Sequence, residues 1–300
     1  MAPRIGRQTF TLIRPFVALV LAAAVFTGCV EQGNVATPSS PAGSAAPSAT
    51  PARSSASGGF YLRAWQTQAL APQYTFGWLP VATVSGGQFI DGMVAIPMIY
   101  PGPIYSGLSA RSISAAGIDA IIAEARTDGL LGDKSDFNET AMPGSITAHI
   151  EIVVGGVAHD LTGSLPSGGT TSAAAPGTAD AFHAFWNRIS SLGIWLNADL
   201  GQSSPYSPAS IAVMLTPPAQ TPTDLKVQET VWPLTGTFAG FGIPMGNGGS
   251  RCATVSGSDL GKLLPVVQAS NQLTRFVDSS GTKMSLQVRV LVPGDAGPCA

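Results

Sequence analysis

The stretch Ser145-Ile-Thr-Ala-His-Ile-Glu-Ile-Val-Val-Gly-Gly-Val-Ala-His-Asp-Leu-Thr162 contains two strand-like segments on either side of a glycine pair. Residues 145–154 and 157–162 are rich in β-branched and apolar residues, which predicts two strands. The pair Gly155-Gly156 is a turn signal between them. The stretch therefore predicts neighbouring strands of a largely antiparallel sheet.

Segments on both sides of this stretch predict an α+β fold. Further strands are expected at 60–65, 74–84, 211–216 and 284–292, where aromatic, β-branched or apolar residues gather. Apolar residues recur three and four positions apart at about 114–129, 179–192 and 255–264. This spacing predicts three helices, which we expect to pack on one side of the sheet.

The folded region is either one domain, residues 59–300, or two similar α+β subunits. The pattern Val255-Ser256-x3-Leu260-x2-Leu263-Leu264 repeats the spacing of Ile113-Ser114-x3-Ile118-x2-Ile121-Ile122. A proline-rich joint at 217–223 would separate subunits 59–217 and 223–300. Amphipathic helices commonly share such spacing, so chance similarity is an equal alternative.

The first 28 residues have the pattern of an export signal. Three arginines precede an unbroken apolar run at 16–26, and small residues lead into Cys29. The run is about half the length of a membrane-spanning helix. Residues 25–28 resemble the lipobox of bacterial lipoproteins, with Phe26 where leucine is usual.

Two interpretations of Cys29 follow from this signal. It is either an ordinary residue near a secretory cleavage site or the acylated first residue of the mature chain. Residues 36–58 contain only Ala, Gly, Pro, Ser and Thr except for Arg53, a composition typical of a flexible spacer. Because a tethered domain needs such a spacer, we favour a palmitate-type lipid anchor on Cys29 and a tether over 29–58.

Charge and cysteine count restrict the classes of function. Residues 59–300 contain 11 Lys and Arg against 16 Asp and Glu, so the region lacks the basic character of nucleic-acid-binding domains. Cys252 and Cys299 are the two cysteines after Cys29. In an oxidising compartment such a pair predicts a disulfide, the alternative being a reactive thiol or metal ligand.

The C-terminal third contains a series of short motifs: Arg251-Cys252, Val255-Ser256-Gly257, Asp259-Leu260, Asn271-x-Leu273-Thr274, Leu286-x-Val288-Arg289-x-Leu291-x-Pro293-Gly294 and Cys299. Through these motifs the chain resembles a family of actinobacterial-type surface lipoproteins with no established activity. Weaker similarity extends over Ser112–Leu131. The resemblance implies a location in the cell envelope and pairing of the two C-terminal cysteines.

A few polar and aromatic residues are candidates for ligand binding. His149 and Glu151 are two positions apart in an expected strand and therefore share a face. They either contact a ligand or form the solvated side of a half-buried strand. The aromatic candidates, which would otherwise be core residues, are Trp65, Trp78, Tyr100 and Tyr105.

The sequence contains no Gly-x-Ser-x-Gly, Gly-x-Gly-x-x-Gly or Walker motif. The acidic loop at 133–139 lacks the layout of an EF-hand, so neither metal nor cofactor is predicted. We therefore expect a non-catalytic binding or structural module on the extracytoplasmic face of the cell membrane, with an envelope protein, sugar or peptide as ligand. The alternatives are an envelope hydrolase using His149, Glu151 and Asp160, and a module that captures a small ligand between the two candidate subunits.

Overall fold

The computed structural model describes residues 59–70, 72–93, 99–138, 145–165, 175–220, 225–246 and 248–299. The expected signal segment, Cys29 and the tether lie outside these residues. All described residues belong to one compact unit, Pro47–Ala300. Within the described ranges, no helix is both long enough and apolar enough to cross a membrane.

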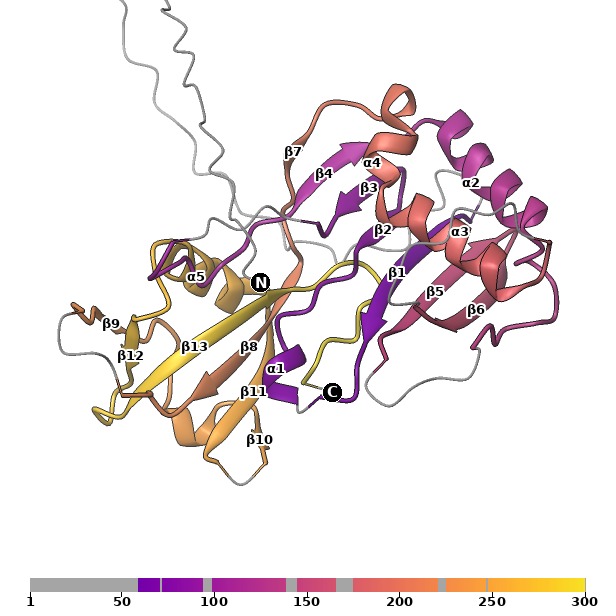
Figure 1. Cartoon of the computed structure of the whole chain (residues 1–300). Helices are drawn as coiled ribbons and strands as arrows, with labels where there is room; N and C mark the ends of the chain where they lie inside the picture. Colours follow the sequence, from indigo (N-terminus) through magenta and orange to yellow (C-terminus); the bar gives the residue numbers. More distant parts are fainter. Residues whose placement is uncertain are drawn as a thin grey trace, which may run out of the picture. The chain divides into compact units, whose positions relative to one another are not determined.

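The first half of the described chain forms a seven-stranded antiparallel sheet in the order β6-β5-β1-β2-β3-β4-β7 (Figure 1). The hairpin of β5 and β6 turns at Gly155-Gly156, as the sequence predicts. The strands are β1 (Tyr61–Thr67), β2 (Ala82–Ser85), β3 (Gln88–Asp91), β4 (Ser109–Ser112), β5 (Thr147–Val154), β6 (Val157–Ser164) and β7 (Ser204–Pro205).

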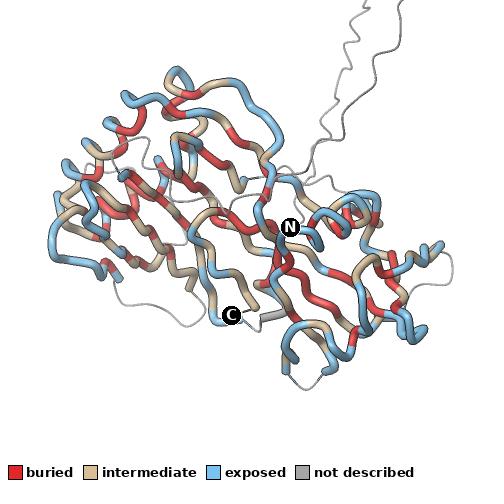
Figure 2. The backbone as a smooth tube through the Cα atoms, turned by 180° about the vertical axis from the view of Figure 1, so that it is seen from behind, coloured by how far each residue is buried: buried red, intermediate tan, exposed pale blue. Residues whose placement is uncertain are grey.

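Two long helices cover one face of this sheet, α2 (Ala115–Thr127) and α3 (Ala179–Ser190). The side chains of Ser114 and Thr178 accept hydrogen bonds from the first turns of α2 and α3, which fixes where each helix begins. Figure 2 shows buried residues running through the strands beneath the helices. Shorter elements are α1 (Pro72–Thr75), α4 (Leu192–Trp195) and η1 (Asn197–Asp199).

The second half forms a six-stranded sheet in the order β10-β11-β8-β13-β12-β9, in which β9 and β12 are parallel and the other pairs antiparallel. Helix α5 (Gly257–Gln268) packs on it through Leu263 and Val267 and continues past Pro265. The other elements are β8 (Ser210–Thr216), β9 (Glu229–Val231), η2 (Phe238–Gly240), β10 (Ile243–Met245), β11 (Ser250–Ser256), β12 (Arg275–Val277) and β13 (Lys283–Val290).

The expected α+β class, the mostly antiparallel sheet and the three long helices are confirmed. Two details differ from the sequence interpretation. The chain changes sheets between β7 and β8, so the strand at 211–216 belongs to the second sheet although it precedes the joint at 217–223. Residues 74–81 are not strand, because Pro72 begins the short helix α1 and irregular chain follows it up to β2.

The C-terminal segment after β13 crosses the face of the first sheet that the helices leave open. Val292, and Val290 at the end of β13, pack with Ile90 of β3, Ala110 of β4 and Leu108 just before β4. The predicted disulfide is confirmed: Cys252 and Cys299 are joined, with a Cα–Cα distance of 5.3 Å. The bond ties the end of this segment to β11, so residues 291–299, the C-terminal tail, are held at both ends.

Candidate functional site

Strand alternation places four polar or aromatic side chains on the open face of the first sheet. On β1, Leu62 and Ala64 are fully buried under the helices, so Arg63 and Trp65 point to the other side. Register pairs Arg63 with Glu151 and Trp65 with His149 on β5. Cross-strand pairing therefore brings the predicted residues Trp65, His149 and Glu151 together.

These side chains contact one another as an aromatic and ionic cluster. The rings of Trp65 and His149 are stacked, with centroids 5.1 Å apart and planes 9° from parallel. The guanidinium carbon of Arg63 lies 4.2 Å from the Trp65 ring centroid, within the range of a cation–π interaction. Arg63 Nη2 is 3.2 Å from Glu151 Oε2, so Arg63 joins the ring pair to the carboxylate.

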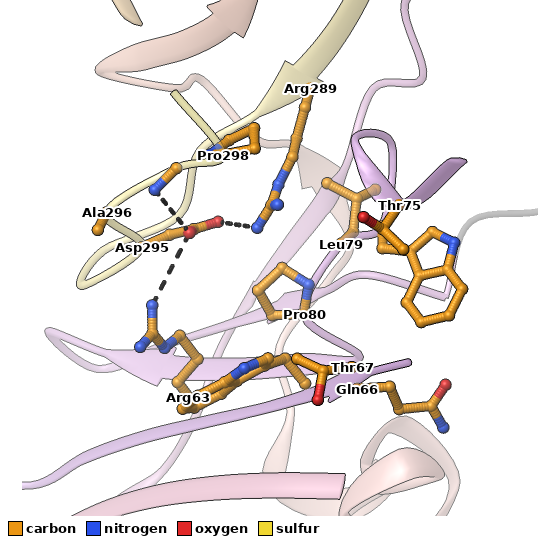
Figure 3. Close-up of a pocket in the computed structure, with 13 residues that line it drawn as sticks. Arg63, Gln66, Thr67, Thr75, Leu79, Pro80, Arg289, Asp295, Ala296 and Pro298 are labelled. Atoms are coloured by element: carbon orange, nitrogen blue, oxygen red, sulfur yellow. Dashed lines mark hydrogen bonds and ion pairs between the residues drawn. The ribbon is translucent and has the colours of Figure 1, made fainter. Parts of the chain in front are cut away.

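The C-terminal tail completes the cluster from the other side (Figure 3). Asp295 has a side chain only 8% exposed and lies between two arginines. Its Oδ2 accepts a hydrogen bond from Arg289 Nη2 at 2.6 Å, and its Oδ1 is 3.9 Å from Arg63 Nη1. Arg63 Nη1 also donates to the carbonyl of Gly294 at 2.5 Å. The tail is thus attached to β1 through the Arg63–Asp295 charge pair and the Arg63–Gly294 hydrogen bond, and to β13 through Arg289.

A cavity of about 290 Å³ lies between this cluster, the α1 segment and the tail. Trp78, which follows α1, lines the cavity together with Trp65, and no aromatic ring among the described residues stacks on Trp78. The remaining lining residues are Arg63, Gln66, Thr67, Thr75, Leu79, Pro80, Arg289, Asp295, Ala296, Gly297 and Pro298. This mixture of aromatic, apolar and a few polar groups is typical of small-ligand sites.

The six candidate residues divide into two groups in the structure. Trp65 and Trp78 line the cavity, and His149 and Glu151 contact its lining residues from behind. Tyr100 is 65% exposed and is not a lining residue, while Tyr105 packs between two core clusters. Burial raises the pKa of Tyr105, as expected for a structural phenol.

Sequence reasoning missed Arg63, Arg289 and Asp295, which hold the cavity together. Arg63 alternates with Trp65 in an expected strand, and that alternation would have placed both on one face. Nothing in the local sequence indicates that Asp295, 232 positions from Arg63, lies beside it. Their proximity follows from the path of the tail across the first sheet.

The cluster also contains a hydroxyl–imidazole pair. Thr67 Oγ1 and His149 Nε2 are 2.7 Å apart, which is the spacing of a nucleophile and its base. Glu151, the nearest carboxylate in the cluster, is directed to Arg63 rather than to His149. Asp160 faces Glu151 across the β5–β6 register. Within the described ranges, no group of three or more His, Cys, Asp or Glu residues has the geometry of a metal site.

The ionisation of His149 gives a test of this arrangement. Burial, and then the charge of Arg63, lower the pKa of His149 below 6.5. Since the unfolded chain then binds the proton more readily, the stability that neutral His149 contributes is complete above a pH of about 6.5 and is lost as the pH falls below it.

The variant His149→Gln should therefore be less sensitive to acid than the parent chain. Its free energy of unfolding, measured with urea, should fall less between a pH of about 7 and a pH of about 5. His159→Gln on β6 is the matched control, and an equal loss in all three proteins would contradict the arrangement.

Comparison with known proteins gives no assignment for this site. The chain matches no protein-family model, no curated protein and no solved structure.

Proposed function

We propose that the protein is a non-catalytic ligand-binding lipoprotein, tethered through Cys29 to the extracytoplasmic face of the cell membrane. Its ligand site is the cavity lined by Trp65 and Trp78. The observation that supports this proposal is that three separate segments line the same open cavity. They are strand β1, the α1 segment and the C-terminal tail. Trp78 offers a ring without a stacking partner among the described residues, which is the group a bound ring or chain would contact.

The charge pairs in the lining of the cavity favour a ligand-binding role over a purely structural role. Arg63, Arg289 and Asp295 are held by mutual charge pairs, so the polar groups of the lining are fixed before a ligand arrives. Such preorganisation lowers the entropy cost of binding.

Removal of the Trp78 ring tests the binding role. In a thermal-shift screen of the full chain against sugars, peptides and amphiphiles, a true ligand raises the melting temperature because it binds the native state. Trp78→Ala should abolish that rise and weaken the affinity at least about tenfold, which corresponds to one lost aromatic contact of about 1.4 kcal/mol. Trp195→Ala on α4 is the matched control. Ligand binding that is unchanged in Trp78→Ala would contradict the assignment of the cavity.

The membrane tether has a separate test at Cys29. Cells grown with an alkyne-labelled palmitate should incorporate label into the parent chain, and the chain should fractionate with membranes. Cys29→Ser should remove both the label and the membrane association. Cys299→Ser serves as the control for loss of a cysteine. Label that persists in Cys29→Ser would place the acyl chain elsewhere.

The hydrogen bond between Thr67 and His149 supports one alternative function, an envelope hydrolase. Thr67 lines the cavity, so an activated hydroxyl there would face a bound substrate. The hydrolase interpretation requires that Thr67→Val and His149→Gln each abolish turnover of an envelope ester or amide while ligand binding persists. Binding with no turnover in the parent chain would leave the non-catalytic proposal in place.

A further inference from the structure

A second cavity adjoins the one lined by Trp65 and Trp78. It has a volume of about 310 Å³, and Leu79 and Arg289 line both cavities. The rest of its lining is largely apolar and includes Val81, Val288 and Val290. The two cavities thus share two lining residues, and the first contains aromatic and charged groups whereas the second is largely apolar.

The charged groups around the first cavity balance one another. Arg63 and Arg289 are positive, and Asp295 is negative. Glu151, which pairs with Arg63 from outside the lining, supplies the second negative charge. Arg63 uses both terminal nitrogens, for Gly294 and Glu151, whereas Arg289 uses Nη2 for Asp295.

The guanidinium group of Arg289 can donate hydrogen bonds to a second acceptor. Among the described residues, neither its Nη1 nor its Nε has a hydrogen-bond partner, and Nε is buried. A guanidinium binds carboxylates through two parallel N–H groups, so a planar anion could join Asp295 at Arg289. Because the charges around the cavity already balance, a singly charged carboxylate adds less uncompensated charge than a phosphate monoester, which carries about −1.5 to −2.

We propose that the two cavities form one elongated site for a long-chain carboxylate. The carboxylate binds beside Arg289 and near the Trp65–Trp78 end, and the alkyl chain passes over Leu79 into the apolar cavity. This inference rests on the proposed binding function and names the ligand class. Burial of the chain against Val81 and Val288, which are only partly buried, removes apolar surface from water, and this drives the binding.

The test uses a fluorescent fatty acid, cis-parinaric acid, and its methyl ester. The protein is the full chain carrying Cys29→Ser, which removes the thiol expected to be acylated. The acid should bind more tightly than the ester. Arg289→Gln should weaken binding of the acid about tenfold more than binding of the ester, because only the acid loses a charge-assisted hydrogen bond. Arg126→Gln on α2 is the charge-matched control.

A second variant blocks the apolar end without touching the charges. Gly77 lines the apolar cavity, and a Cβ built there meets no atom within 4 Å, so Gly77→Phe adds a ring without a backbone clash. It should weaken binding of acid and ester alike by at least tenfold. Gly261→Phe on α5, where a Cβ is equally free, is the control. Circular dichroism of each variant verifies folding.

The outcomes separate this inference from the proposed function. Equal binding of acid and ester, or tighter competition by a lysophosphatidic acid than by palmitate, would overturn the carboxylate assignment. If cis-parinaric acid fails to bind while another compound gives a Trp78-dependent thermal shift, the long-chain carboxylate is the wrong ligand class. The proposed binding function is then still supported. If no compound gives a Trp78-dependent shift, the proposed function falls as well.

Discussion

Replacement of Cys252 and Cys299 by serine is expected to lower the free energy of unfolding by about 4 kcal/mol. The disulfide closes a loop with a sequence separation of 47, and the loop-closure entropy of the unfolded chain scales with the logarithm of that length. The melting temperature should fall by roughly 8–16 °C, at about 2–4 °C per kcal/mol for a domain of this size. Urea unfolding of the double-serine variant against the parent chain measures the difference.

The same variant should loosen the wall of the ligand cavity. Residues 295–298 line the cavity and directly precede Cys299, so loss of the bond leaves their end attached only by non-covalent contacts. Hydrogen exchange of the tail peptide should accelerate by a larger factor in the double-serine variant than exchange in α2, because α2 amides respond only to the loss of global stability whereas the tail also opens locally. The parent chain with Cys29→Ser is the control for a cysteine lost outside the fold. A stability loss below about 1 kcal/mol would show that the bond is not a structural support.

Phe182→Ala is expected to destabilise the fold by about 3–5 kcal/mol. The ring is fully buried in α3 and stacks on Phe137 at a centroid distance of 5.4 Å. It also fills the space next to Gly163 on β6, where a Cβ would come within 2.5 Å of the ring. Truncation therefore opens a cavity between helix and sheet that the backbone cannot close.

This substitution also tests whether residues 59–300 unfold as one domain or as two subunits. Phe276, fully buried in the second sheet, provides the matched variant Phe276→Ala. If the region is one cooperative domain, each variant should accelerate hydrogen exchange in both sheets by the same factor. Acceleration confined to the mutated sheet would identify two subunits.

A destabilisation below about 1 kcal/mol in Phe182→Ala would contradict the packing of Phe182 between α3 and the first sheet.

The parts of the fold that follow local rules were predictable from sequence. The Gly155-Gly156 hairpin and the capped helix after Ser114 depend on neighbouring residues, and both lie where the sequence places them. The start of β2 was predicted wrongly. Aromatic residues at 74–78 have high strand propensity, but Pro72 and Pro80 restrict the backbone around them. The sheet boundary before β8 depends on long-range pairing, which the proline-rich joint at 217–223 does not report.

The candidate site was predictable only where one strand face was involved. Alternation along β5 correctly groups His149 with Glu151, and aromatic character singles out Trp65. Arg289 and Asp295 join them through tertiary structure alone, since the tail must cross the first sheet to reach Arg63. Aromatic character also selected Tyr100 and Tyr105, which do not line the cavity. The residue type alone does not indicate where a side chain lies in the folded protein.

We expect a ligand to occupy the cavity beside Trp78 in the cell envelope. Photocrosslinking can detect such a ligand: p-benzoyl-L-phenylalanine replaces Trp78 in the full chain, and Trp195 in a control chain. After irradiation in intact envelopes, the peptide containing residue 78 should gain the mass of a small molecule, while the peptide containing residue 195 should not. No light-dependent adduct at residue 78, or the same adduct at both positions, would contradict the account.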